Sequence, residues 1–158
     1  MKTATLKTIE QSDNVSLYSI CFDGNEESEY ETFLRKFKED AKLNSDFQKI
    51  FRAINRIIAN GAFERYFRPE GRMKDHVAAL SVDSKILRLY CLRISDQILI
   101  AGNGGAKHTK TYQESEELQG YVMDLQKFDK LLAQAQEKGI VSIQKNYISG
   151  IESISFDL

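Results

Sequence analysis

The stretch 85-KILRLYCLRISDQILIAGNGGAKHTK-110 decides the fold of this chain. It contains two apolar runs of β-type residues, Ile86–Ile94 and Ile98–Gly102, separated by the short polar segment 95–97. Two such runs joined by a tight turn predict a β-hairpin at the centre of a sheet. The glycine-rich residues after Gly102 predict an irregular exit from the second strand.

Cations and an aromatic hydroxyl interrupt this otherwise apolar stretch, at Arg88, Tyr90, Arg93, Lys107, His108 and Lys110. A strand that only fills a core has little use for two arginines, so the excess points to a partner that carries phosphate. Alternation along a strand places Arg88 and Tyr90 on one face and Arg93 on the other, unless a bulge re-aims it.

The charge of the chain is unevenly distributed, although the net charge is only −1. Residues 1–48 hold six Lys and Arg against ten Asp and Glu, and residues 111–158 hold four against eight. Residues 49–110 hold twelve against five, a net charge of +7. Because the local field attracts a polyanion, this central basic block is compatible with nucleic-acid binding. The alternative is that acidic and basic segments pair within the fold.

The 158 residues suit one domain spanning the whole chain, residues 1–158. No apolar run approaches the length of a membrane span, and the polar start lacks a signal-peptide core, so no membrane partner and a cytoplasmic location are expected. Cys21 and Cys91 each lie in a strand-like run without a CxxC neighbour, which favours buried reduced thiols.

The periodicity of apolar residues predicts three helices, at Glu29–Ala41, Ser45–Asn60 and Asp124–Lys138. Besides the central hairpin, β-type runs occur at Leu6–Ile9, Val15–Phe22, Val77–Val82, Gly120–Met123, Ile140–Ile143 and Ile151–Phe156. The first two predict a hairpin, with Val15–Phe22 in the main sheet. The predicted class is α+β, a twisted antiparallel sheet with helices packed on it.

The segment 62–75 mixes aromatic and cationic residues, namely Phe63, Arg65, Tyr66, Phe67, Arg68, Arg72 and Lys74. Aromatic rings between cations suit an unstacked base and its phosphate, so Arg65, Arg68, Arg72 and Lys74 are candidate nucleic-acid contacts. The alternative is that the rings fill the core while the arginines face water.

Most common catalytic motifs are missing from the sequence. The glycine-rich segment is not a GxxxxGK[ST] loop, and no apolar helix opens directly behind its G-x-G, so no nucleotide cofactor is expected. His76 and His108 are isolated, so no metal is expected. The remaining cations and tyrosine suit RNA cleavage by its own 2′-hydroxyl, with Lys or His as base, Arg stabilising the phosphorane charge, and Tyr or His as acid.

Two early helices, a strand, the RLYCLR strand, a second apolar strand and the GGAKHTKT exit resemble the RelE/ParE/HigB toxin superfamily in its phage-derived form. The resemblance covers about residues 30–135, with extensions at both ends. It implies a RelE-like fold and the toxin of a type II toxin–antitoxin pair: a ribosome-associated, metal-independent mRNA endonuclease, neutralised by an antitoxin of helix-turn-helix type. Arg88, Tyr90, Arg93, Lys107 and His108 would form the catalytic set, and Lys110 would bind RNA.

The chain departs from this pattern at its C-terminus, where the family often places a catalytic Tyr or His. Here the chain ends in SISFDL, and Tyr147 is the nearest candidate. Two alternatives therefore remain. One is a non-catalytic RelE-fold module that binds a protein or a nucleic acid, and the other is a toxin that inhibits DNA gyrase.

Overall fold

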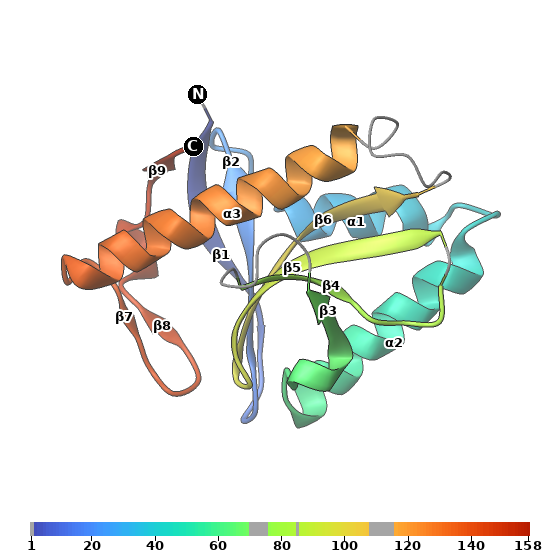
Figure 1. Cartoon of the computed structure of the whole chain (residues 1–158), viewed down its shortest axis with the longest axis horizontal. Coiled ribbons are helices and arrows are strands. Elements are labelled where there is room, and N and C mark those ends of the chain that lie inside the picture. Colours follow the sequence, from blue (N-terminus) through green and yellow to red (C-terminus); the bar gives the residue numbers. More distant parts are fainter. Residues whose placement is uncertain (1, 70–75, 85, 108–115) are drawn as a thin grey trace.

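The computed structural model of the chain (Figure 1) describes residues 2–69, 76–84, 86–107 and 116–158. Its elements in chain order are β1 (Thr3–Gln11), β2 (Ser16–Phe22), α1 (Glu29–Lys38), α2 (Asn44–Asn60), η1 (Glu64–Tyr66), β3 (Phe67–Pro69), β4 (Val77–Leu80), β5 (Leu87–Ser95), β6 (Ile98–Ala106), α3 (Glu116–Glu137), β7 (Ser142–Ile143), β8 (Ile148–Ser149), η3 (Ile151–Ser153) and β9 (Phe156–Asp157).

Within the described residues, seven strands form one sheet in the order β3-β4-β5-β6-β2-β1-β9, and β7 and β8 pair separately. The predicted α+β class is confirmed, as are the β1–β2 and β5–β6 hairpins. The prediction of an antiparallel sheet needs one correction, because β2 and β6 pair in parallel. Parallel neighbours need a long crossover, and here α1, α2 and three strands lie between them in the chain.

Helices cover both faces of this sheet (Figure 1). On one face, Leu87, Leu89 and Cys91 of β5 join the apolar cluster that includes residues of α1 and α2. On the other face, Tyr90 and Leu92 join the cluster that includes α3. Strands buried on both faces are apolar throughout, which explains the nearly continuous apolar runs of β5 and β6.

Helix α1 begins with a capping box that pairs Ser28 with Glu31. The Ser28 hydroxyl accepts from the backbone N–H of Glu31 at 3.2 Å, and the Glu31 carboxylate accepts from the backbone N–H of Ser28 at 3.0 Å. Both bonds satisfy donors that a helix start leaves without intrahelical partners. The helix ends at Lys38, three residues before the predicted end.

Three larger differences concern α3, β6 and the C-terminal strand. Helix α3 begins at Glu116 and not at Asp124, so the run Gly120–Met123 is helical. Strand β6 continues to Ala106, so residues 103–106, predicted as an irregular exit, are part of the sheet. The last predicted strand, Ile151–Phe156, is a 3₁₀ turn followed by β9.

Both cysteines are buried and unbridged, as predicted. Burial raises the pKa of the Cys91 thiol to about 12, and it also raises the pKa of Cys21. In the described part of the chain, no helix combines the length and apolarity that crossing a membrane requires.

Candidate functional site

Arg88 and Tyr90 lie on the face of β5 that packs against α3. Tyr90 belongs to the apolar cluster on that face and is only 5% exposed. Arg88 lies opposite Gly105 of β6, and a Cβ placed on Gly105 would be 2.9 Å from a Leu118 methyl of α3. The Nε atom of Arg88 is buried and has no hydrogen-bond partner among the described residues. This orphaned donor is the most unusual feature of the predicted catalytic set.

Arg93 lies on the opposite face, as the alternation predicts, and it is bound by the protein itself. Its Nε donates to the carbonyl of Ala62 at 2.7 Å, and its guanidinium pairs with Asp96 and, at 3.7 Å, with Glu64. The side chain is only 18% exposed. Arg93 therefore anchors the segment that follows α2, and its charge is already matched by two carboxylates.

We expect Arg93→Gln to lower the free energy of unfolding by about 2 kcal/mol, because hydrogen bonds to charged groups contribute about 1.5–3 kcal/mol. Arg93→Lys retains the charge without the planar fork and should recover only part of the loss. Urea denaturation measures both effects. A Gln variant of wild-type stability that lost a nucleic-acid activity would instead favour a direct role for Arg93.

The structure therefore does not bring the five predicted catalytic residues into one site. Arg88 and Tyr90 share a face and Arg93 lies on the other, while half-buried Lys107 follows β6 and donates its backbone N–H to Ile86 at 2.7 Å. Four predicted site residues lie outside the described residues: His108, Lys110, Arg72 and Lys74.

The cation and aromatic residues after α2 form a connected group. The Arg65 guanidinium lies 4.8 Å from the ring centre of Phe63 and 4.9 Å from that of Tyr66, and it donates to the Tyr66 hydroxyl at 3.3 Å. Phe63 and Tyr66 themselves lie 6.0 Å apart. Exposed Arg68 is in β3, paired with Ala79 of β4. Phe67 and Tyr66 pack on the core while Arg65 is exposed, as the second alternative for this segment describes, and contact with a nucleic acid stays a prediction.

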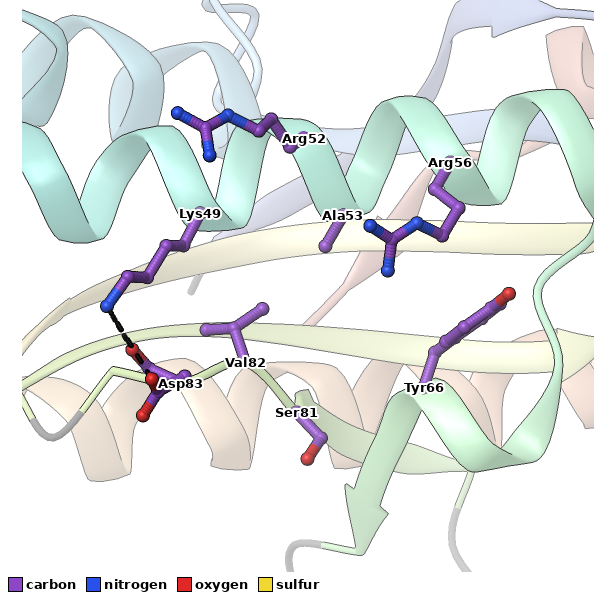
Figure 2. Close-up of a pocket in the computed structure, with 8 residues that line it drawn as sticks. All are labelled: Lys49, Arg52, Ala53, Arg56, Tyr66, Ser81, Val82 and Asp83. Atoms are coloured by element: carbon purple, nitrogen blue, oxygen red, sulfur yellow. Dashed lines mark hydrogen bonds and ion pairs between the residues drawn. The ribbon is translucent and has the colours of Figure 1, made fainter.

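A cleft of about 330 Å³ opens between the outer face of α2 and the residues just after β4 (Figure 2). Its lining residues are Lys49, Arg52, Ala53, Arg56, Tyr66, Ser81, Val82 and Asp83. In Figure 2 Lys49 and Arg56 extend from α2 toward the other side of the cleft, where Tyr66, Ser81 and Asp83 lie, and the Arg52 side chain runs along α2. Ala53 and Val82 supply apolar surface between the two sides. The cleft is therefore amphipathic, with a cationic wall and one aromatic ring.

The charges in this cleft are only partly matched. Lys49 donates to the Asp83 carbonyl at 2.6 Å and lies 3.9 Å from the Asp83 carboxylate. Arg52 and Arg56 are exposed, and within the described ranges neither guanidinium has a hydrogen bond or ion pair. Lys49, Arg52 and Arg56 against Asp83 leave an excess of two positive charges, which would attract an anion.

Arg52 and Arg56 belong to the basic block of residues 49–110, but they are not among the site residues that the sequence predicts. Their spacing carries a signal that could have identified them. Like charges four residues apart on a helix face each other and destabilise it by a few tenths of a kcal/mol. Two arginines in that arrangement, without a carboxylate at i±3 or i±4 from either, suggest a use outside the helix.

A second, much smaller hollow lies where β2 and β6 diverge, between Glu29 of α1, Asn103 of β6 and Tyr121 and Asp124 of α3. Asn103 is buried and donates to Glu29 at 3.4 Å, and burial raises the pKa of Glu29. The hollow measures about 10 Å³, room for about one water molecule. A water molecule in this hollow can hydrogen-bond to the buried polar groups, but the hollow is too small to hold a substrate.

The described residues contain no group of three or more His, Cys, Asp or Glu side chains placed to hold a metal ion. Comparison of the chain with protein-family models, with curated proteins and with solved structures found no match.

Proposed function

We propose that this protein is a RelE-like module that binds the phosphate backbone of a nucleic acid in the α2 cleft. The observation that carries the proposal is the pair Arg52 and Arg56, one helical turn apart, exposed and without partners in the described part of the chain, on one wall of a 330 Å³ cleft with Tyr66 on the other wall. Guanidinium groups are suited to phosphate because they present several donors in one plane.

The chemistry of the cleft favours a polymer with regularly spaced phosphates. Side chains four apart on a helix lie about 5–6 Å from each other at Cβ, so two guanidiniums can each contact a neighbouring phosphate. The residues that line the cleft all come from the sequence block 49–110, which has a net charge of +7 within a chain whose total is −1. Such a local field raises the rate and strength of polyanion binding even when the net charge is slightly negative.

The RelE-like part of the proposal is supported by the order of elements. Helices α1 and α2, strands β4, β5 and β6, a lysine-bearing segment and helix α3 follow one another as the sequence resemblance implies. The matched charge of Arg93 and the burial of Tyr90 favour binding over catalysis.

One observation favours a second candidate, the toxin that cleaves ribosome-bound mRNA. The buried Arg88 Nε has no partner among the described residues, and it lies on the face of β5 that also holds Tyr90, near the end of β6. His108 and Lys110 follow that end in sequence. In this candidate function, the Arg88 side chain binds a phosphate of the mRNA. An antitoxin of helix-turn-helix type blocks the activity in the cytoplasm.

Binding of a labelled single-stranded RNA, measured by fluorescence anisotropy between about 50 and 200 mM salt, tests the first proposal. Two or more phosphate contacts predict that log K falls with log salt concentration with a slope of about −1.4 or steeper, at about 0.7 per contact. If the protein shows no salt-dependent binding of RNA, the proposed binding of a phosphate backbone is wrong.

Induced expression with mapping of mRNA ends tests the toxin. We expect new mRNA ends and arrested translation if it is an endonuclease, and their loss in Arg88→Ala. DNA damage without mRNA cleavage would indicate a gyrase inhibitor instead. Unaltered mRNA together with RNA binding in vitro would support the non-catalytic binding module.

A further inference from the structure

We propose that the α2 cleft accepts one unpaired nucleotide at a time, with its base stacked on Tyr66 and its phosphates on Arg52 and Arg56. The module would therefore select single-stranded over double-stranded nucleic acid. This inference rests on the proposed function and adds the strandedness of the ligand and the residue that reads it.

Tyr66 is held in place before any ligand arrives. Its backbone N–H donates to the carbonyl of Phe63 at 3.0 Å, and its own carbonyl accepts from the N–H of Ser81 at 2.8 Å. Its hydroxyl accepts from Arg65 at 3.3 Å, and the Arg65 guanidinium lies 4.9 Å from its ring centre. These contacts fix the ring at the cleft wall, so little conformational entropy is lost when a base stacks on it. Arg65 does not line the cleft, so a base would stack on the side of the Tyr66 ring that does.

The position of Tyr66 relative to the cations suits a nucleotide. Figure 2 shows Arg56 extending from α2 toward Tyr66, with Ala53 and Val82 as apolar surface further along the cleft. A base is flat and apolar on its faces while its phosphate is anionic, so it matches a ring and an apolar wall beside two guanidiniums. Each base has a π-face, so this mode of binding tolerates any sequence.

A duplex cannot place one of its bases on the Tyr66 ring in this cleft. At about 330 Å³ the cleft is at the small end of ligand pockets, and bases in a duplex are already stacked and paired. The Lys49 end of the cleft is less suitable for phosphate, because Lys49 is already bound to Asp83. The Asp83 side chain is 99% exposed, so its negative charge also faces an approaching phosphate. The phosphates are therefore expected at Arg52 and Arg56.

Two substitutions of Tyr66 test the stacking. Tyr66→Leu removes the ring and is expected to weaken binding of single-stranded RNA roughly tenfold. Tyr66→Phe keeps the ring and loses only the hydroxyl bond to Arg65, so its affinity should stay close to that of the wild type. Thermal unfolding of both variants shows whether the fold is intact.

A matched set of ligands tests strandedness on the wild-type protein and does not depend on the variants folding. The set contains one single-stranded RNA, the same RNA in a duplex, and the strand with abasic sites. We expect the single strand to bind at least several-fold more tightly than the other two.

Equal affinity for all three ligands, with no effect of Tyr66→Leu, would overturn the stacking inference while leaving backbone binding intact. Failure of the wild-type protein to bind any of them would overturn the proposed function and the inference together.

Discussion

Replacing Gly104 by alanine is expected to destabilise the protein by about 3 kcal/mol or more, at the upper end of what overpacking costs. A Cβ at Gly104 would lie 1.9 Å from the carbonyl oxygen of Arg88 and 3.0 Å from the Cα of Leu89. Both are backbone atoms of β5, so no side chain can rotate away to make room. The hairpin at the centre of the sheet would have to separate locally, with loss of the pairing between Leu89 and Gly104.

Gly120→Ala is the matched control. Gly120 lies within α3, and a Cβ there meets nothing within 4 Å. Alanine is about 1 kcal/mol more favourable than glycine inside a helix, so this variant should be more stable than the wild type. In urea denaturation, the free energy of unfolding is expected to fall in Gly104→Ala and to rise in Gly120→Ala. If Gly104→Ala is insoluble while Gly120→Ala is soluble, the conclusion is the same. Equal stability of the two would show that β5 and β6 do not approach this closely.

The same two glycines show where the sequence misled. Glycine disfavours both strands and helices, and the sequence predicts that residues 103–106 leave the sheet and that residues 120–123 lie outside a helix. The structure extends β6 through Ala106 because Gly104 permits the close approach of β5 and Gly105 that of Leu118. Tertiary packing decides these positions, and a local propensity carries no information about it.

The faces on which the side chains of β5 lie could be predicted from the sequence, because successive residues of any strand point to opposite faces. This alternation placed Arg88 and Tyr90 on one face and Arg93 on the other, and both placements agree with the structure. Pairing between distant strands is a different matter. Nothing in the local pattern of β2 or β6 indicates that they lie side by side in parallel.

The candidate site shows the same limit. The basic block that begins at residue 49 and the mixed aromatic and cationic residues of 62–75 are both visible in the sequence as separate features. Their juxtaposition depends on Arg93, which holds Ala62 against the β5–β6 hairpin, and on the bond from Ser81 to Tyr66. Those contacts join segments that are distant in sequence, so a sequence pattern alone could not have assembled the cleft.

The double variant Arg52→Gln with Arg56→Gln is expected to lose about a hundredfold in affinity for single-stranded RNA. A hydrogen bond to a charged group contributes about 1.5–3 kcal/mol, so each arginine should account for roughly a tenfold change. The slope of log K against log salt concentration should become shallower by about 1.4, at about 0.7 for each phosphate contact. Stability should not fall, because the substitution removes a like-charge pair at i, i+4.

Lys127→Gln with Lys130→Gln provides the control for net charge. Both lysines are exposed on α3, which packs on the other face of the sheet, and the double substitution removes the same two positive charges. If RNA binds in the α2 cleft, this control should retain nearly the affinity and salt dependence of the wild type. If both double variants weaken binding to the same extent, the attraction comes from the overall charge of the protein and the α2 cleft is not the binding site.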